Sequence, residues 1–168
     1  LMRIENEEQP FHPIYNYALV TDSEEGLILV NVNTLADGLP RNNFLKRSLT
    51  WNENNVLDGA RHITIAGHIV YITTPDALVV LDLNDPLSPQ LLNRIKMNDP
   101  RASALQFRYL LVTDRDGVKI FDATSPNNIK SSPVAAVPLN DAQKVYIART
   151  YAYVAAGKEG LAIIDVKN

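Results

Sequence analysis

The side chains in this sequence with the most obvious chemical potential are carboxylates, which recur in short polar stretches between apolar runs. Carboxylate oxygens are the ligands that Ca²⁺ prefers, and a calcium ion held by them could serve a hydrolase or lactonase. Four acids stand between successive repeats of the chain and are the candidate metal ligands: Glu8, Asp58, Asp99 and Asp141. The structural alternative is that Asp occurs there because it caps turns and tolerates their backbone conformation.

A second group of acids lies in the tight turns inside the repeats. Side chains of one charge gathered on one face attract a partner of the opposite charge. The irregular loop at 33–43, with residues 51–55 after the first repeat, offers the most specific contact surface. The candidate interaction residues are Asp22, Glu24, Asp76, Asp114, Asp116, Glu159 and Trp51.

Several chemistries are excluded by residue types and motifs that the chain lacks. It contains no Cys, which rules out disulfides, thiolate catalysis and cysteine zinc sites. It has no nucleophile elbow, Gly-rich phosphate loop or spaced His/Glu metal motif. His12 and His62 fall on equivalent predicted strands, so a paired metal or haem role is conceivable. These features favour a binding module over an enzyme and imply no cofactor except, as an alternative, Ca²⁺.

The composition is that of one globular domain. The chain has 168 residues, of which 46% are hydrophobic and 21% charged, enough to bury a core without crosslinks. The net charge of -3 and the scattered basic side chains give no electrostatic footprint for nucleic acid. The apolar runs are far shorter than the roughly 20 residues of a membrane span. We therefore expect neither nucleic acid binding nor membrane insertion.

Internal repeats carry the fold prediction. Four segments align, beginning at Tyr17, Ile69, Tyr109 and Tyr151, with a period of about 40 residues. Each holds two apolar runs rich in Val, Ile, Leu and Tyr, separated by a turn containing Gly, Asp or Pro. Such short β-branched runs predict β-hairpins rather than helices.

Weaker strands flank each hairpin. They are predicted upstream at 12–16, 61–67, 102–108 and 143–149, and downstream at 44–51, 90–98 and 133–140. Four strands per period predict an all-β fold, a β-propeller of four-stranded antiparallel blades, either a closed four-blade ring or part of a larger propeller. The predicted blades span 11–52, 60–98, 101–140 and 143–168, and residues 1–8 are interpreted as an outer strand that closes the last blade.

The third strand of each unit resembles the LVIVD repeat, which is named for that strand. The motif stands as "LILVNV" (27–32), "LVVLDL" (78–83), "VKIFDA" (118–123) and "LAIIDV" (161–166). A following Asp-x-Ser/Asn-Pro type of turn is complete in "NDPLSP" (84–89) and "TSPNNI" (124–129). The resemblance implies a propeller domain of bacterial or archaeal exported, periplasmic or cell-surface proteins, and it implies no catalytic residues.

These observations predict a non-enzymatic scaffold or protein-interaction module that belongs to a larger exported or cell-surface protein. Its partner would be another protein or other domains of its own polypeptide. In a propeller the turns inside the hairpins and the crossovers between blades share one face, so that face is expected to be acidic. The alternative function is a Ca²⁺-dependent propeller hydrolase or lactonase with carboxylates at the channel mouth.

Overall fold

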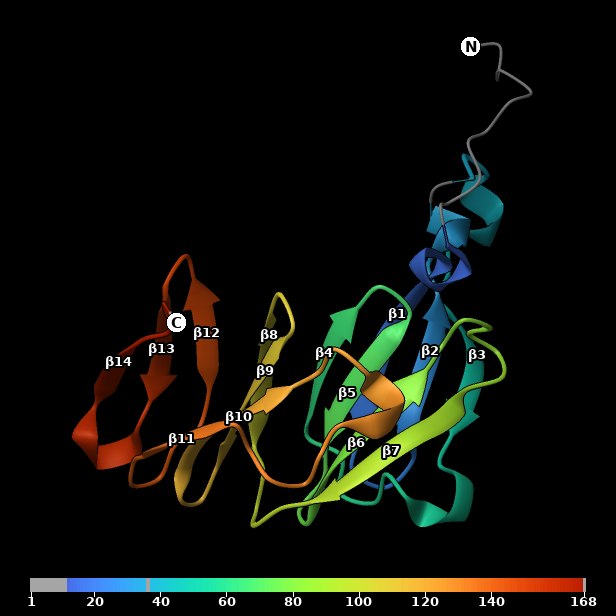
Figure 1. Cartoon of the computed structure of the whole chain (residues 1–168). Helices are drawn as coiled ribbons and strands as arrows, with labels where there is room; N and C mark the ends of the chain where they lie inside the picture. The colour runs from blue at the N-terminus through green and yellow to red at the C-terminus, as the bar shows by residue number, and fades with distance from the viewer. Residues whose placement is uncertain (1–11, 36, 168) are drawn as a thin grey trace.

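The computed structural model describes residues 12–35 and 37–167, and these residues form four antiparallel sheets that stand side by side in an open row (Figure 1). Each sheet is one blade. The all-β propeller class predicted from the sequence is therefore confirmed, and the described residues do not close a ring. The predicted closing strand at 1–8 lies outside the described residues and stays a prediction.

Blades 1 and 2 comprise the first seven strands. Blade 1 has the order β1-β2-β3, with the bounds β1 (Tyr17–Asp22), β2 (Gly26–Asn31) and β3 (Lys46–Trp51). Blade 2 has the order β4-β5-β6-β7, with the bounds β4 (His62–Ala66), β5 (Ile69–Thr73), β6 (Ala77–Asp82) and β7 (Gln90–Lys96).

Blades 3 and 4 comprise the other seven. Blade 3 has β8 (Ala102–Gln106), β9 (Tyr109–Asp114), β10 (Gly117–Asp122) and β11 (Ala135–Pro138), paired in that order. Blade 4 has β12 (Val145–Ala148), β13 (Tyr151–Ala155) and β14 (Leu161–Asp165). Short 3₁₀ turns connect the strands: η1 (Pro13–Asn16), η2 (Asn33–Leu35), η3 (Pro40–Asn42), η4 (Glu53–Asn55), η5 (Pro126–Asn128) and η6 (Gly157–Glu159).

One predicted strand is wrong. Residues 12–16, expected to be the inner strand of blade 1, form the 3₁₀ turn η1. Pro13 lacks an N–H for a β-ladder and its fixed φ suits the first position of a helical turn. The Nδ1 atom of His12 accepts a hydrogen bond from the Ile14 N–H at 3.2 Å and caps that turn. Local chemistry therefore overrides the repeat at this position.

The Asp that ends three of the LVIVD-like strands stabilises the turn that follows. The side-chain oxygen of Asp82, Asp122 or Asp165 accepts a hydrogen bond from the N–H two residues later, at 2.7, 2.9 and 2.9 Å. Asn31 holds the same position in blade 1 and makes the same bond at 2.8 Å. Asn replaces Asp here without loss because its amide oxygen is an equivalent acceptor.

The core lies between the blades, in three apolar clusters, one at each junction of neighbouring sheets. Alternate residues of a strand point to opposite faces of its sheet. A blade therefore has a leading face, which packs on the preceding blade, and a trailing face, which packs on the following one. In blade 2, Val70 and Ile72 lie on the leading face and contribute to the first cluster, whereas Leu78 and Val80 lie on the trailing face and contribute to the second.

Candidate functional site

Most of the predicted acids that the structure describes contact basic or amide side chains, and Asp22 and Asp114 are the last residues of β1 and β9. Asp76 accepts a hydrogen bond from Arg94 at 2.6 Å, and this bond holds the pKa of the Asp76 carboxyl below its usual value. Asp114 is fully buried and paired with Lys119. Lys119 also lies 3.6 Å from Asp116.

The remaining turn acids have simpler roles. Asp22 accepts hydrogen bonds from the backbone N–H groups of Glu25 and Glu24, at 2.9 and 2.8 Å, which lowers the pKa of Asp22. Glu24 itself is exposed. Glu159 accepts a hydrogen bond from Asn140 at 2.5 Å. Asp22 therefore stabilises its own turn, and Glu159 joins its turn to the preceding crossover.

Two of the crossover acids, Asp99 and Asp141, are joined to each other by Arg101. Arg61, at the start of blade 2, pairs with Asp99 in the next crossover. Arg101, at the same place in blade 3, lies 3.3 Å from Asp99 and 2.5 Å from Asp141. Arg61, followed by Arg101, lowers the pKa of Asp99, and hydrogen bonding to Asp141 raises the pKa of Arg101. The result is a line of ion pairs from blade 2 to blade 4.

Backbone geometry gives these Asp residues a further structural role. Asp99 and Asp141 have φ values of 57° and 58°, in the left-handed region, and Gly59 has 73° at the same repeat position. Asp tolerates this conformation better than most side chains. Asp58 stands one position earlier and accepts a hydrogen bond from Asn52 at 2.7 Å.

Three of the predicted calcium ligands, Asp58, Asp99 and Asp141, are therefore in contact with the protein's own donors. No group of three or more His, Asp or Glu side chains among residues 12–35 and 37–167 is placed to hold a metal ion. Glu8 lies outside the described residues, so the calcium site as a whole stays a prediction.

His12 and His62, for which a paired role was considered, have different partners in the structure. The ring of His12 stacks on His68, with 5.6 Å between ring centroids. His62 lies instead at the junction of blades 2 and 3, where its Nδ1 accepts a hydrogen bond from the Ser103 N–H at 3.2 Å. Burial, followed by the charge of Lys144, lowers the pKa of His62, as expected for a histidine inside an interface.

The basic side chains on this face were not predicted from the sequence, because the prediction considered only residues in the turns and not those in the adjacent strands. Arg47, Arg94 and Lys119 project from strands adjacent to the acidic turns. Arg61 and Arg101 occupy the same repeat position, two residues after Gly59 and Asp99, so an alignment of the crossovers contained the signal. The face is a network of ion pairs rather than a surface of isolated carboxylates.

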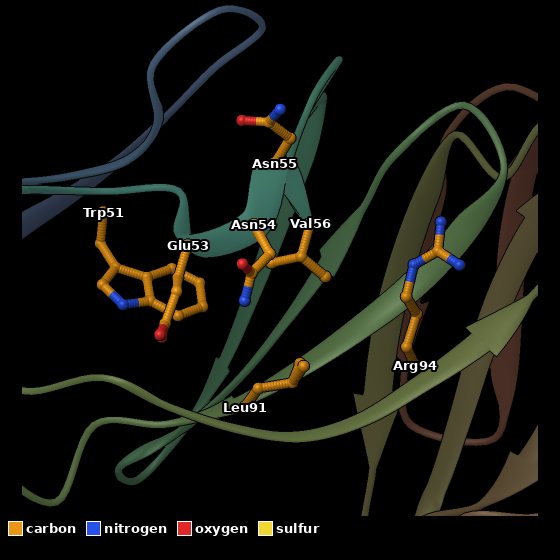
Figure 2. Close-up of a pocket in the computed structure, with 7 residues that line it drawn as sticks. All are labelled: Trp51, Glu53, Asn54, Asn55, Val56, Leu91 and Arg94. Carbon is orange, nitrogen blue, oxygen red and sulfur yellow. The ribbon is translucent and has the colours of Figure 1, made fainter.

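The predicted contact residue Trp51 borders a hollow of about 250 Å³ between blades 1 and 2 (Figure 2). Trp51 and Glu53 stand at one end of the view, Leu91 of β7 lies below them, and Arg94 stands at the other end. Leu91 is exposed and Trp51 is half-buried. The hollow is thus lined by the apolar side chains of Trp51 and Leu91 and bordered by the charged side chains of Glu53 and Arg94.

The loop that forms one wall of the hollow is held by hydrogen bonds. The Asn52 side chain accepts from the Leu57 N–H at 2.8 Å and donates to Asp58 at 2.7 Å. Leu57 is fully buried in the cluster between blades 1 and 2. Asn54 and Asn55 adopt left-handed φ values of 51° and 58°, which Asn tolerates well. The wall is therefore preformed.

Comparison with known families matches the LVIVD repeat over residues 59–96 and 140–168. The chain contains LVIVD repeats. The matched segments cover blade 2 and blade 4, and they confirm the family resemblance for the third strands at 78–83 and 161–166. No curated protein matches the LVIVD chain in a sequence comparison.

Solved structures share the fold of this LVIVD chain at low sequence identity. A functionally unknown protein from Desulfotomaculum acetoxidans DSM 771 has a TM-score of 0.70 at 13% identity, and the match covers 92% of this chain and 52% of that one.

Two computationally designed proteins are similar. For Ika8 the TM-score is 0.64 at 12% identity, covering 90% of this chain and 43% of that one, and for Ika4 it is 0.62 at 11%, covering 90% and 86%. The LVIVD chain thus spans about half the length of two of these three proteins. At such identities the likeness concerns the fold alone.

Proposed function

We propose that this LVIVD chain is a non-enzymatic scaffold that binds an extended, basic segment of another protein in the hollow beside Trp51. The observation that carries the proposal is the preformed wall at residues 51–56 facing Leu91, with Glu53 on the rim. Exposed apolar side chains and a Trp are typical of residues that dominate protein interfaces. A preformed loop also reduces the entropy lost on binding.

The charges at the hollow favour a basic partner. Arg94 is already paired with Asp76 at 2.6 Å, whereas Glu53 is exposed at the start of η4. An apolar side chain of the partner would lie on Trp51 and Leu91, and a neighbouring Lys or Arg would reach Glu53. We further propose an extracellular, cell-surface or periplasmic setting, which the LVIVD repeats support. The described residues include no helix long and apolar enough to cross a membrane.

Trp51 allows a direct test, because it is the only tryptophan of the chain. We expect a synthetic peptide of alternating Lys and Leu to change the Trp51 fluorescence saturably, with Kd on the order of 10 μM. A Glu-Leu peptide of the same length should have no comparable effect. Glu53→Gln should weaken binding several-fold, whereas Glu159→Gln, at an exposed acid of blade 4, should not. Equal responses to both peptides, or none to either, would contradict the proposal.

A further inference from the structure

The trailing face of blade 4 is apolar, and no other part of the described residues packs on it. Four of its large hydrophobic side chains are strongly exposed: Tyr146 at 70%, Tyr151 at 43%, Leu161 at 63% and Ile163 at 59%. They come from all three strands of the blade, β12, β13 and β14, which stand at the end of the row in Figure 1. Contiguous apolar patches of this kind mark interaction sites.

The repeat shows what such a face is built to contact. Leu161 occupies the position of Leu27, Leu78 and Val118, which are buried in the other blades. Ile163 matches Val80, which is fully buried by blade 3. Blade 4 therefore carries the apolar side chains of a blade-to-blade junction, although no following blade covers them in the described residues.

The opposite end of the row has the complementary surface. On the leading face of blade 1, Ala18 and Val20 are exposed, Val20 at 45%. Their repeat counterparts in blade 2 are Val70 and Ile72, both fully buried against blade 1. The trailing face of one end and the leading face of the other are thus the two halves of the junction that the chain forms three times internally.

The polar contacts of the internal junctions are missing at this end. The Thr113 hydroxyl donates to the Gln143 carbonyl at 3.0 Å across the junction of blades 3 and 4, and Ala155 holds the same position in blade 4. Arg101 reaches Asp141 across that junction, whereas blade 4 has Gln143 in the place of Arg101. A contact made by this face would rest on apolar burial and would be reversible.

We propose that the trailing face of blade 4 binds the leading face of blade 1 of a second copy of this chain, head to tail. The contact continues the blade-to-blade junction seen within the chain, with Leu161 and Ile163 packed on Ala18 and Val20. It uses two different patches, so each copy keeps one free patch that can join a second contact. The inference does not depend on the proposed peptide site.

Sedimentation equilibrium of the whole chain tests this proposal. Between about 1 and 100 μM, the range of weak protein association, the average mass should rise above that of one chain. Leu161→Ser combined with Ile163→Ser should raise the apparent Kd at least tenfold. Ile65→Ser, at a half-exposed residue of blade 2 away from both end faces, should leave it unchanged. A chain that stays monomeric, or that associates equally well with the double substitution, would overturn the proposal.

Mixing variants distinguishes head-to-tail contact from pairing of like faces. Val20→Glu blocks only the blade 1 patch, and the double substitution blocks only the blade 4 patch, so each variant should be monomeric alone. Their equimolar mixture should form a dimer through the two intact patches. Undiminished self-association of Val20→Glu would instead indicate pairing of blade 4 with blade 4 and refute the proposal. All three positions are exposed, and circular dichroism with thermal unfolding checks that the variants fold.

Discussion

Blades 2 and 4 carry closely similar hairpins, and the structure gives them opposite surroundings. Leu78 and Val80 of blade 2 are fully buried between two sheets, whereas Leu161 and Ile163 at the same repeat positions are more than half exposed. The two hairpins pair in the same register, in which Ile69 faces Asp82 in blade 2 and Tyr151 faces Asp165 in blade 4. The difference teaches that a blade's sequence specifies its hairpin, while its neighbours decide what the side chains contribute to stability.

Glycine positions show the same contrast. A Cβ at Gly117 would lie 2.2 Å from the Val137 carbonyl oxygen of the outer strand, and a Cβ at Gly26 would lie 2.7 Å from that of Trp51. A Cβ at Gly160, the equivalent residue of blade 4, would meet no atom within 4 Å apart from its chain neighbours. The glycine in blades 1 and 3 thus serves both the positive φ and the close approach of a strand. In blade 4 only the φ of 79° requires it.

The comparison is tested most directly by shortening the side chain at the same repeat position in blades 2 and 4. Leu78→Ala should destabilise the fold by about 3 kcal/mol, because it leaves a cavity in a closed core. Leu161→Ala should cost less than about 0.5 kcal/mol, as surface substitutions usually do. Urea unfolding followed by circular dichroism, at a concentration where the chain is monomeric, measures both. Equal losses would show that the face of blade 4 is covered within a single chain.

The ion pairs between crossovers should matter where they join two blades. Arg101→Met removes the bonds to Asp99 and Asp141 and should cost about 2 kcal/mol, since hydrogen bonds to charged groups are among the stronger ones. Gln143→Met, at the equivalent position of blade 4, should cost clearly less. Chemical unfolding of the two variants decides this, and a similar cost for both would remove the distinction between inner and end blades.

The ion pairs of Asp99 also predict that the stability of the fold depends on pH. The pKa of Asp99 is lowered in the fold by Arg61 and then by Arg101. The stability that this carboxylate contributes is therefore complete above its unfolded pKa, near about 4, and is lost as the pH falls through the lowered value. Between pH 5 and 3 (about one unit either side of that value), the melting temperature of Arg101→Met should fall less steeply than that of the wild type.

The smallest effect concerns the turn between the first two strands of each blade. Phe107 has a φ of 53° and is 92% exposed, while Gly67 holds the same position in blade 2 with 63°. Phe107→Gly should stabilise the chain by about 1 kcal/mol, because a left-handed residue with a Cβ is strained. Phe107→Ala is the matched control. It removes the ring and keeps the Cβ, so a gain of equal size there would show that strain is not the cause.

Much of the fold follows from local patterns in the sequence. The β-branched runs, the Gly and Asp turn residues and the period of about 40 residues correctly predicted the hairpins and the propeller class. The role of Asp82, Asp122 and Asp165 at the ends of three third strands follows from the sequence, because the hydrogen bond of each is local, to the N–H two residues later. Pro13 broke the pattern by equally local chemistry.

The contacts of the carboxylates could not be derived in that way. Asp99 pairs with Arg61 from another blade, and Asp114, which was predicted to lie in an exposed turn, is the buried last residue of β9 and pairs with Lys119. Such pairs depend on where side chains far apart in sequence meet in space. The sequence by itself determined the hairpins and their repetition, because turn preference and alternation act within a few residues. Only the tertiary structure decided which acids are paired and which apolar faces are covered, because both depend on the neighbouring blade.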